Sequence, residues 1–542
     1  MRGLMQDTPL TLDRFLWRAA NLFPSSRIAS GHPDGTKRTT FASWHERTCR
    51  LRGVLDELGV PLGARVGTLC WSTSEHLELT FGVPCAGRVL HTLNPRLFRD
   101  QLTYIIDHAE DEVLFVHHSL VELVADLLPG LSGVRHVVVI DGPAPASLPG
   151  VDTHEYEGLL ASVTPADPVA ADETDAASLC YTGGTTGVPK GVLYSHRSLV
   201  LHALGTMMAG GIGIHEADVV MPVVPLFHAN AVGFAHAAIA SGADLVLPGQ
   251  DLSGDALAGL LETESVSVTC GVPTVWSAVL PELKGRDLSR LRIVISGASA
   301  VPPSLSESFR EVTGRPLTQI WGMTETSPLG TIATVRSSLS DLDEQELVEL
   351  RASVGMPVPG VEVRIRDREG NDLPWDGRSP GELEVRGWWV AAAYFELDAP
   401  DSFTGDGWLR TGDVATIDAN GYVRIVDRLK DVIKSGGEWI SSIELENLLM
   451  DHPSVAEAAV IGVADTHWGE RPLACVVLRD GAAADAASLT EHLRGRVASW
   501  WLPDRFEFVS SIPRTAVGKF AKSELRDRFG AELDTRNDDI GS

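Results

Sequence analysis

The chain has 542 residues, of which 44% are apolar and 22% are charged, and its formal net charge is −28. A single hydrophobic core rarely grows to this length, so we expect two or more domains. The acidic balance argues against a general surface for nucleic acids or anionic membranes. Local positive groups would therefore have to meet any anionic substrate.

The cysteines and the apolar segments fit a protein of the reducing cytoplasm. The six cysteines are widely scattered and form no CxxC pair, so the sequence indicates neither a zinc site nor a disulfide framework. The first residues lack the apolar stretch of a signal peptide, and no run of 18 apolar residues occurs. We therefore expect a cytoplasmic location, with no membrane span and no standard secretion signal.

The first two-thirds of the chain alternate between strand and helix patterns. Apolar residues recur at helical spacing from Leu12 to Leu22, and residues 37–41 have an extended pattern. Further on, the pattern predicts a helix over 74–87 and strands over 65–71, 88–93, 113–116, 177–181, 244–247, 267–270 and 291–295. Such alternation predicts parallel sheets covered by helices.

The pattern changes near residue 353. Strand patterns at 361–365, 381–385 and 422–426 alternate with turn-rich spacers, which predicts a β-rich subdomain over about 353–427. A small α+β pattern follows Arg428, with helices expected at 441–451, 488–497 and 521–529 and strands at 457–462, 473–478 and 505–509. We therefore expect one domain over 1–429 and a second over 430–542.

The stretch from Tyr181 to Gly191, Tyr-Thr-Gly-Gly-Thr-Thr-Gly-Val-Pro-Lys-Gly, predicts a site for a polyphosphate. It lies between an expected strand and an expected helix capped by Ser195. Glycines let backbone N–H groups approach an anion, the threonines add donors, and Lys190 adds a mobile charge. The pattern is not a Walker loop, because Pro189 precedes the lysine and glycine follows it. The alternative is a flexible linker, which has no reason to carry this ordered run.

Four further stretches carry chemistry that is weaker when each is taken alone. Thr324 and Glu325 follow an expected strand and pair a hydroxyl with a carboxylate, which suits Mg²⁺ beside phosphates. Asp413, expected at a turn, could accept both hydroxyls of a ribose. His228 stands at a turn before an apolar helix, and Lys519 follows a glycine in a loop. The alternatives are a structural glutamate, a turn aspartate, a core histidine and a surface lysine.

Together and in this order, these stretches resemble the adenylate-forming superfamily of acyl-CoA synthetases, luciferases and peptide-synthetase adenylation domains. The resemblance extends from about residue 12 to 529 and is carried by 181–191, 227–230, 319–325, 411–413, 428–437 and 513–519. Residues 91–97 and 434–441 are most similar to the fatty-acyl and methylthiopropionate-CoA ligase branch. The resemblance implies an α/β fold: a large domain of two helix-covered, mostly parallel sheets plus a β-rich subdomain, and a small mobile α+β domain.

The resemblance also implies a role for each matched residue. Catalytic roles would fall to Lys519, Thr185, Lys190, Glu325 and His228. The phosphates of ATP would be held by Thr182, Gly183, Gly184, Thr185, Thr186, Gly187 and Lys190, with Thr324 touching phosphate and Glu325 binding Mg²⁺. The adenine would lie between Gly297, Ala298 and Ser299 on one side and Trp321 on the other, and Gly322 and Met323 would also bind a cofactor. Asp413 and Arg428 would hold the ribose and Lys430 would be the hinge. Gly436 and Gly437 would line the pantetheine tunnel, and Lys434 and Trp439 would also bind a cofactor.

The sequence departs from the family pattern mainly in the substrate pocket, which would be lined by His228, Val232, Gly233, His236, Ala298 and Gly322. Val232 stands where fatty-acid relatives often have tryptophan, and His236 where an aromatic residue is frequent. Elsewhere, Gly183 replaces a common serine and Trp321 a common tyrosine. The pocket would be open and apolar with one imidazole. One interpretation is a substrate with a second polar group, such as an aryl hydroxyl or amine. The alternative is that Val232 only changes the packing of the helix.

The resulting expectation is an ATP-dependent ligase that converts a carboxylic acid to an acyl-adenylate with release of pyrophosphate, then to a CoA thioester with release of AMP. ATP, Mg²⁺ and CoA would be needed, nucleic acid would not be a partner, and a homodimer is left open. One alternative keeps adenylation but changes the acceptor to a carrier-protein thiol or an amine, including ATP- and nitrite-dependent diazotisation of an aryl amine. Another is a nucleotide-binding regulatory protein that has lost catalysis.

Overall fold

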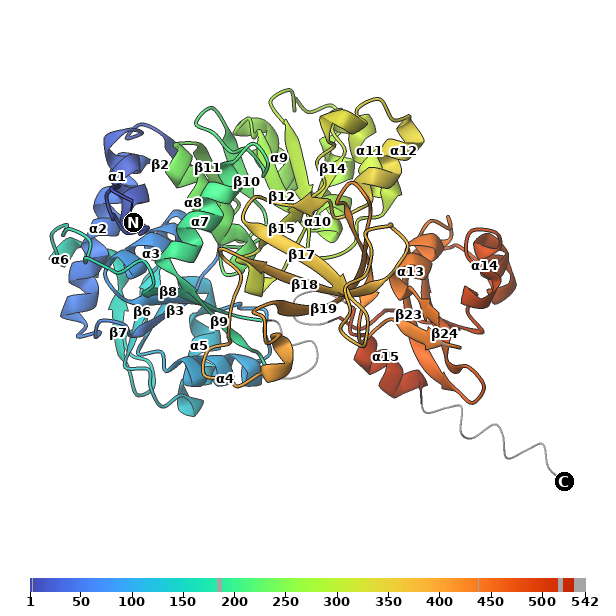
Figure 1. Ribbon diagram of the computed structural model, residues 1–542. Helices are drawn as coiled ribbons and strands as arrows, with labels where there is room; N and C mark the ends of the chain where they lie inside the picture. Colours follow the sequence, from blue (N-terminus) through green and yellow to red (C-terminus); the bar gives the residue numbers. More distant parts are fainter. Residues whose placement is uncertain (2, 183–187, 437, 515–519, 531–542) are drawn as a thin grey trace. The chain divides into compact units, whose positions relative to one another are not determined.

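The computed structural model describes residues 1, 3–182, 188–436, 438–514 and 520–530 (Figure 1). This part of the chain divides into two compact units. The first consists of residues 1–182, 188–362 and 385–409, and the second of 363–384 together with the described residues from 410 onward. The second unit thus takes in most of the β-rich segment as well as the C-terminal residues. The expected domain boundary at 429/430 stays a prediction.

A seven-stranded sheet organises the first part of unit 1. Its order is β7-β6-β5-β3-β4-β8-β9, and all neighbours are parallel except the β8/β9 hairpin. The strands are β3 (Arg65–Leu69), β4 (Val89–Thr92), β5 (Val113–His117), β6 (His136–Ile140), β7 (Asp152–Glu155), β8 (Ala176–Tyr181) and β9 (Gly191–Ser195).

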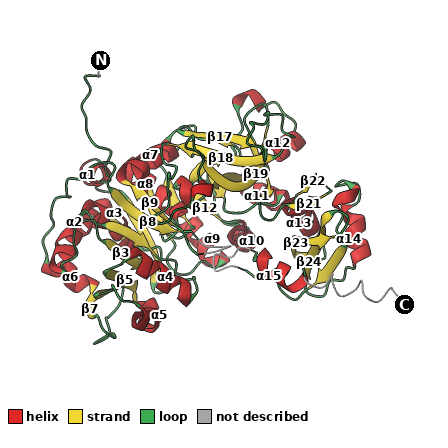
Figure 2. Ribbon diagram, turned by 60° about the horizontal axis from the view of Figure 1, so that its bottom comes forward, coloured by secondary structure: helices red, strands yellow, loops and turns green. Residues whose placement is uncertain are grey.

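Helices cover this sheet because alternate residues of a strand point to opposite faces. Val113 and Phe115 of β5 pack into a core with α2 (Phe41–Glu57) and α3 (Ser74–Cys85). Leu114 and Val116 pack into a different core with α4 (Arg99–Ala109) and α5 (Val121–Leu127). Figure 2 shows these helices around the sheet. A strand buried on both faces reads as a continuous apolar run, which is why β5 was predictable.

A nine-stranded sheet organises the rest of unit 1, in the order β16-β15-β14-β13-β12-β10-β11-β1-β2. Its central pairs are parallel, and β2, β15 and β16 are antiparallel additions at the two ends. The strands are β1 (Arg27–His32), β2 (Gly35–Thr40), β10 (Val219–Pro222), β11 (Asp244–Leu247), β12 (Val268–Gly271), β13 (Ile293–Ser296), β14 (Leu317–Gly322), β15 (Leu329–Ile332) and β16 (Met356–Pro357).

The helices of this region bury a large core and connect the two sheets. Leu257, Trp276 and Phe309 bring α9 (Gly254–Thr263), α10 (Pro273–Val279) and α11 (Pro303–Thr313) onto the nine-stranded sheet. The helix α8 (Ala229–Ser241) contacts β10 and β11, whereas α7 (His196–Met207) contacts both α8 and β9. The predicted Ser195 cap is confirmed, since its side chain accepts from the Ser198 N–H of α7. The remaining helices are α1 (Asp13–Asn21), α6 (Tyr156–Ser162) and α12 (Glu344–Arg351).

Two smaller sheets lie mostly in the second unit. The predicted β-rich segment forms a four-stranded sheet in the order β17 (Val361–Arg366), β18 (Gly381–Gly387), β19 (Leu409–Ile417) and β20 (Val423–Arg428). The C-terminal residues form a five-stranded sheet of β21 (Ile433–Ser435), β22 (Glu438–Ile440), β23 (Val455–Asp465), β24 (Gly469–Leu478) and β25 (Arg505–Phe508). The helices α13 (Ser442–Met450), α14 (Ala486–Leu493) and α15 (Lys522–Phe529) accompany them.

The expected fold class is confirmed, and one expected helix is corrected. The pattern predicted a helix over 488–497, but α14 ends at Leu493. The C-cap residue Arg494 is already extended, and Gly495 follows with a φ of +76°, a left-handed conformation that a right-handed helix cannot continue through. The helix therefore ends before the apolar Val497, which joins the small core without being helical.

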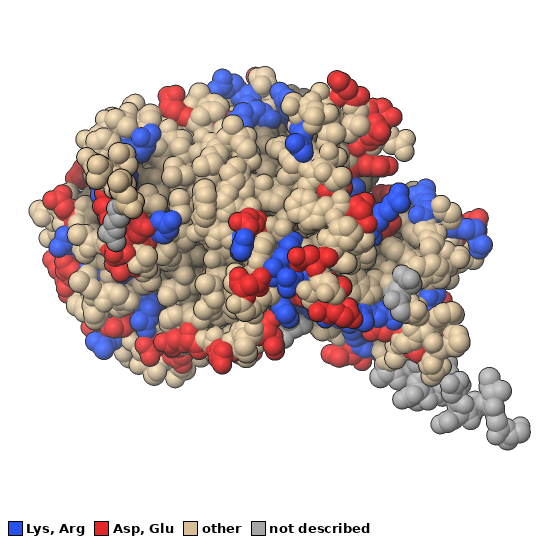
Figure 3. Space-filling model, viewed as in Figure 1, with Lys and Arg blue, Asp and Glu red and all other residues tan. Residues whose placement is uncertain are grey.

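The charges on the face drawn in Figure 3 are mixed in sign. Basic and acidic side chains occur there in separate small groups among uncharged residues, with no continuous basic surface on that face. Among the helices of the described residues, none combines the length and the apolar content that a membrane crossing requires.

Candidate active site

The ends of the predicted phosphate loop are fastened together by hydrogen bonds. The Thr182 N–H donates to the Lys190 carbonyl (2.9 Å), and the Lys190 N–H donates to the Thr182 hydroxyl (3.1 Å). These bonds continue the β8/β9 ladder, in which Tyr181 is opposite Gly191. The loop therefore leaves and re-enters the sheet at one point. Its predicted phosphate-binding residues Gly183, Gly184, Thr185, Thr186 and Gly187 lie outside the described residues.

The Lys190 ammonium group lies over an aromatic ring contributed by a distant segment. Its Nζ atom is 4.6 Å from the centroid of the Tyr394 ring and 3.4 Å from the Ser402 hydroxyl. The Phe395 N–H donates to the Gly191 carbonyl (2.8 Å), which fastens this segment to the start of β9. A cation over a ring face is attracted by the negative potential of the π-system. Among the described residues no acid forms an ion pair with Lys190, so the ring orients the ammonium without neutralising it.

Glu325 meets the same tyrosine. It lies in a 3-10 turn, Thr324–Thr326, directly after β14, and it is only 4% exposed. The Tyr394 hydroxyl donates to Glu325 Oε1 (2.6 Å), and the Ala391 N–H donates to the Glu325 carbonyl (2.8 Å). Burial and the adjacent Glu325 raise the pKa of Tyr394, so the phenol stays protonated as a donor.

Thr324 is tied to the β9 side of the site. The Tyr194 hydroxyl donates to the Thr324 carbonyl (2.7 Å), and burial raises the pKa of Tyr194 well above its usual value. Hence the structure brings Lys190 of the predicted phosphate loop and the predicted Thr324–Glu325 pair into one contact network, through two tyrosines. Local sequence gave no signal for either tyrosine, because Tyr194 lies in a short strand and Tyr394 follows three alanines.

The predicted adenine walls lie at the ends of neighbouring strands β13 and β14. Gly297 follows β13 and packs against Ile320, while Ala298 and Ser299 are exposed. Ala298 has a φ of +68°, and a non-glycine residue in this region carries strain of about 1–3 kcal/mol, which is found most often at functional sites. The Trp321 ring is 8% exposed and packs against Gly330 of β15.

Gly322 occupies a position at which no side chain fits. A Cβ atom there would lie 1.6 Å from the Pro328 carbonyl oxygen. The next residue, Met323, forms two hydrogen bonds with the Thr326 hydroxyl. The Met323 carbonyl accepts from Thr326 Oγ1 (3.1 Å), and the Met323 N–H donates to the same oxygen (2.9 Å). The turn that carries Thr324 and Glu325 is therefore folded tightly against the end of β14.

The predicted acid pocket lies along α8. His228 is the N-cap residue of this helix, is partly buried, and its ring lies 5.0 Å from that of Phe227. Gly233 is buried against His202 of α7, with which an added Cβ would collide at 2.2 Å. The side chain of Val232 lies outside the described part of the structure.

His236 is enclosed rather than presented to an open slot. Its side chain is 1% exposed, and its ring packs edge-to-face on Phe81 with centroids 4.8 Å apart. Neither ring nitrogen has a hydrogen-bond partner within the described residues. Burial lowers the pKa of His236 to about 3, so the imidazole is neutral. Its predicted role as a pocket residue stays a prediction.

The predicted ribose-binding residues form an ion pair in the second unit. Asp413 and Arg428 are opposite each other in β19 and β20, and Arg428 Nε lies 2.9 Å from Asp413 Oδ1. The expectation that Asp413 ends a turn is wrong. Asp413 is in the middle of β19, where it is paired with Arg428 of β20.

The residues predicted for the pantetheine tunnel and two further predicted cofactor-binding residues lie in or beside the β21/β22 hairpin. Lys434 and Trp439 are opposite each other, the Lys434 side chain is exposed, and the Arg368 guanidinium lies 5.5 Å from the Trp439 ring centroid. The Gly436 N–H donates to the Trp468 carbonyl (2.8 Å). Gly437 lies outside the described residues.

The predicted hinge residue Lys430 follows β20. Burial lowers its pKa, and its carbonyl accepts a hydrogen bond from Arg526 of α15 (3.3 Å). Arg526 also pairs with Asp431 at 2.6 Å. The next residues after the predicted hinge are therefore anchored to the C-terminal helix. Lys519, the predicted catalytic lysine, lies outside the described residues.

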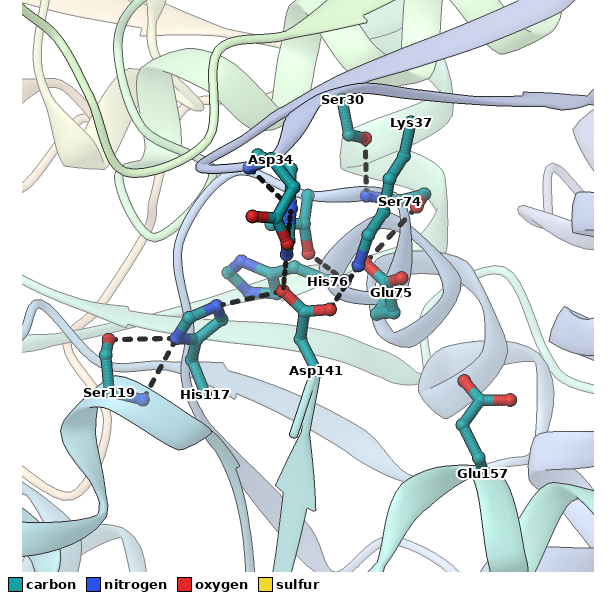
Figure 4. A network of polar contacts seen from close by, with 12 residues as sticks. Ser30, Asp34, Lys37, Ser74, Glu75, His76, His117, Ser119, Asp141 and Glu157 are labelled. Carbon is teal, nitrogen blue, oxygen red and sulfur yellow. Dashed lines mark hydrogen bonds and ion pairs between the residues drawn. The ribbon is translucent and has the colours of Figure 1, made fainter. Parts of the chain in front are cut away.

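A separate polar cluster surrounds Asp141, at the end of β6 (Figure 4). The Nε2 atoms of His117 and His32 each lie 3.4 Å from Asp141 Oδ2, and the Lys37 ammonium contacts Oδ1. A carboxylate between two imidazoles could belong to a metal centre or could accept hydrogen bonds from both rings. The positions of the ring protons distinguish these two arrangements.

A backbone N–H faces Nδ1 of each ring, and the Ser119 hydroxyl also lies 2.9 Å from His117 Nδ1. The Ser119 N–H donates to His117 Nδ1 (3.3 Å), and the Asp34 N–H donates to His32 Nδ1 (3.2 Å). A neutral ring that accepts at Nδ1 carries its proton on Nε2, and this proton points at the carboxylate. Metal binding needs a bare ring nitrogen. In this arrangement the two imidazoles and Lys37 surround the Asp141 carboxylate. His117, the exposed His118 and Asp141 also place possible ligand atoms within 4.8 Å of one another.

The comparisons with known proteins agree with the resemblance found in the sequence. The AMP-binding enzyme family matches residues 16–395, and the AMP-binding enzyme C-terminal domain matches residues 444–519. The chain is 44% identical over 536 residues to 3-methylmercaptopropionyl-CoA ligase of Ruegeria lacuscaerulensis, covering 98% of this chain and 99% of that protein. It is 45% identical over 531 residues to the long-chain-fatty-acid–CoA ligase of Thermus thermophilus, covering 97% and 96%.

A solved structure extends this agreement to the fold. The anthranilate CoA ligase AuaEII, in complex with anthranoyl-AMP, superposes with a TM-score of 0.83 at 27% identity, covering 97% of this chain and 99% of that chain. Family, identity and fold therefore agree along nearly the whole sequence. The chain belongs to the AMP-binding enzyme family, among its acyl-CoA ligases.

Proposed function

We propose that this ligase activates an acid with a mainly apolar chain, and that Lys190, Thr324 and Glu325 act on the triphosphate of ATP. The observation that carries the proposal is the contact network in which Tyr194 and Tyr394 unite these residues from segments far apart in the sequence. Within the described residues, no acid pairs with Lys190 and no base pairs with Glu325. Both charges are therefore available to a ligand.

Mg²⁺ fits the donor set around Glu325. The donors are oxygens, namely a carboxylate and the neighbouring Thr324 hydroxyl, and Mg²⁺ prefers one or two carboxylates together with phosphate oxygens and water. Tyr394 occupies Oε1, which leaves Oε2 for the metal. When bound, Mg²⁺ would neutralise phosphate charge and favour departure of pyrophosphate. Glu325 would hold the ion, and Lys190 would bind phosphate oxygens.

In the first half-reaction, residues of the chain would stabilise the developing charges and orient the ribose. A carboxylate oxygen of the acid attacks the α-phosphorus of ATP, a new P–O bond forms, and the bond to pyrophosphate breaks. Lys190 and the backbone donors of its loop would stabilise the charge that collects on the departing phosphates. Lys519 would stabilise the charge at the α-phosphate, and Asp413 would orient the ribose. In the second half-reaction the CoA thiolate attacks the acyl carbonyl, and AMP departs with the bonding electrons.

An apolar acid is favoured by the surroundings of α8. Of the two imidazoles predicted for the pocket, His228 and His236, the nitrogens of His236 are enclosed, so a polar group on the substrate could not reach them without rearrangement. The two curated relatives described above are named for an acid with a thioether chain and for long-chain fatty acids. Both chains are apolar. We therefore favour a 3-methylmercaptopropionate-like or unbranched fatty acid over a hydroxy- or amino-substituted aryl acid.

The decisive experiment supplies ATP, Mg²⁺ and one acid at a time, and measures pyrophosphate release and thioester mass with and without CoA. The panel contains 3-methylmercaptopropionate, hexanoate, palmitate, 4-hydroxybenzoate and anthranilate. We expect a CoA thioester with the highest kcat/KM for an apolar chain. A preference for either aryl acid would overturn the assigned substrate class, and pyrophosphate release without any thioester would overturn the acceptor.

Variants separate the residue roles from the overall reaction. Lys190→Met should slow pyrophosphate release by roughly a hundredfold, as expected for loss of a positioned charge. Lys284→Met, at an exposed lysine of the same unit, is the matched control and should have wild-type activity. Lys519→Ala should nearly abolish adenylate formation yet spare thioester formation from a supplied acyl-adenylate. Equal loss of both steps would contradict that division.

A further inference from the structure

Tyr394 contacts two opposite charges at once. Its hydroxyl donates to the Glu325 carboxylate at 2.6 Å, and its ring face lies 4.6 Å from the Lys190 ammonium. The backbone on either side of the ring is fixed as well: Ala391 N–H donates to the Glu325 carbonyl, and Phe395 N–H donates to the Gly191 carbonyl, each at 2.8 Å. The tyrosine is therefore held between the two segments that carry these charges.

This placement keeps the lysine and the glutamate apart. A lysine and a glutamate that approach within 4 Å in a partly buried site attract each other by several kcal/mol before desolvation is counted. Such a pair would occupy both groups and leave neither for phosphate or metal. The described residues contain no ion pair between Lys190 and Glu325, and the ammonium lies 4.6 Å from the Tyr394 ring centroid and 3.4 Å from the Ser402 hydroxyl. A π-face attracts the ammonium without neutralising it.

We propose that Tyr394 is a positioning residue that holds Glu325 ready for Mg²⁺ through its hydroxyl and holds Lys190 ready for phosphate through its ring. This inference rests on the proposed function of Glu325 and Lys190. The hydroxyl and the ring carry separable tasks, because the first needs only the oxygen and the second needs only the aromatic face. A residue that merely filled space would not divide in this way.

The test uses two substitutions at one position. Tyr394→Phe removes the hydroxyl and keeps the ring, whereas Tyr394→Leu removes both. Tyr156→Phe is the control, because Tyr156 also donates to a carboxylate of the same unit, that of Glu78 at 2.7 Å, although this bond is buried and that of Tyr394 is part-buried. Binding of a non-hydrolysable ATP analogue is measured by titration calorimetry, first without metal and then at increasing Mg²⁺ concentrations. Pyrophosphate release is measured over the same Mg²⁺ series.

We expect Tyr394→Phe to raise the Mg²⁺ concentration for half-saturation about tenfold, as loss of a partner behind a metal ligand typically does. Its metal-free affinity for the analogue should be that of the wild type. Tyr394→Leu should show the same Mg²⁺ shift and, in addition, a metal-free affinity about threefold to tenfold weaker, because Lys190 is no longer held by the ring. Tyr156→Phe should change thermal stability alone.

Glu325→Gln distinguishes failure of this inference from failure of the proposed function. If Glu325→Gln leaves the Mg²⁺ dependence unchanged, Glu325 does not hold the ion, and the proposed function is wrong at that residue. If Glu325→Gln shifts the dependence but Tyr394→Phe does not, the role of Tyr394 is overturned. An equal loss of metal-free and Mg²⁺-dependent binding in Tyr394→Phe would also overturn it, because that is the result of general disruption.

Discussion

Asp413 and Arg428 form a 2.9 Å ion pair between directly opposed residues of β19 and β20, with the aspartate side chain 4% and the arginine side chain 41% exposed. The guanidinium occupies one side of Asp413 Oδ1. If this carboxylate receives the ribose, the arginine fixes its orientation before ATP arrives.

Asp413→Asn should therefore weaken ATP binding. An amide can accept from one ribose hydroxyl but presents an NH₂ donor to the other. A hydrogen bond to a charged group contributes about 1.5–3 kcal/mol, so we expect affinity to fall roughly tenfold to a hundredfold. Calorimetric titration with ATP and with 2′-deoxyATP checks the cause: the wild type should discriminate between the two nucleotides, and the variant should not. Undiminished discrimination would remove Asp413 from the ribose site.

The same residue shows what the sequence could and could not predict. Thr-Gly-Asp is a good local turn signal, yet cross-strand pairing with β20 keeps Asp413 within a strand. Buried strands such as β5 were predictable because their whole length is apolar. The role proposed for Tyr394 could not be predicted, because it depends on contacts with Lys190 and Glu325, which are remote in sequence. Motifs with chemistry built into consecutive residues, such as Thr324–Glu325, were visible without the fold.

A second prediction concerns Lys522, which is buried with two carboxylates in the second unit. Its Nζ atom lies 2.6 Å from Glu446 Oε1 and donates to Ser442 Oγ at 2.6 Å, while Ser442 donates to Asp427. Burial alone would lower the pKa of Lys522, but the carboxylates outweigh burial and raise it. Burial raises the pKa values of Glu446 and Asp427, and Lys522 opposes that rise.

Lys522→Met should reduce the free energy of unfolding by about 3–5 kcal/mol at pH 8, because it leaves two buried carboxylates uncompensated. Their pKa values then rise further above the unfolded values. A raised folded-state pKa gives stability that is present below the unfolded pKa and lost as pH rises through the folded pKa, so the deficit should shrink toward pH 5. Urea unfolding at pH 5, 7 and 8 measures it, with the exposed Lys434→Met as control. A deficit that is independent of pH would contradict the argument.

A third prediction concerns acid sensitivity at His236. Burial lowers its pKa to about 3, whereas the unfolded value is near 6.5. Below pH 6.5 the unfolded chain therefore binds a proton that the folded chain excludes, so stability falls as pH falls, by about 1.4 kcal/mol per pH unit for this group. His236→Phe should remove this loss, leaving the variant about 2 kcal/mol less acid-sensitive between pH 6.5 and 5.

His202→Phe provides the contrast for that measurement. Burial also lowers the pKa of His202 to about 3, but its Nε2 accepts the Leu329 N–H at 3.2 Å, whereas His236 has no partner among the described residues. Both variants should lose acid sensitivity, and only His202→Phe should lose about 1–3 kcal/mol at neutral pH.

In the acid panel, an altered ranking of acids by His236→Phe would place the imidazole beside the substrate. An unchanged ranking would leave it as a core residue.

The last prediction concerns Gly322, at the end of β14 beside the turn that carries Glu325. Gly322→Ala would set a methyl group 1.6 Å from the Pro328 carbonyl oxygen, and backbone on both sides must move to relieve the overlap. Overpacking of this kind costs about 1–3 kcal/mol or more, and the movement would displace Glu325, which follows three residues later. We therefore expect a lower unfolding midpoint together with a higher Mg²⁺ requirement for pyrophosphate release.

Gly158→Ala is the control, because Gly158 lies in α6 with no atom closer than 4.0 Å to the added carbon, and alanine favours a helix. That variant should be at least as stable as the wild type. A Gly322→Ala protein with a wild-type midpoint and Mg²⁺ dependence would show that the turn tolerates displacement, so that Glu325 is not held by its backbone.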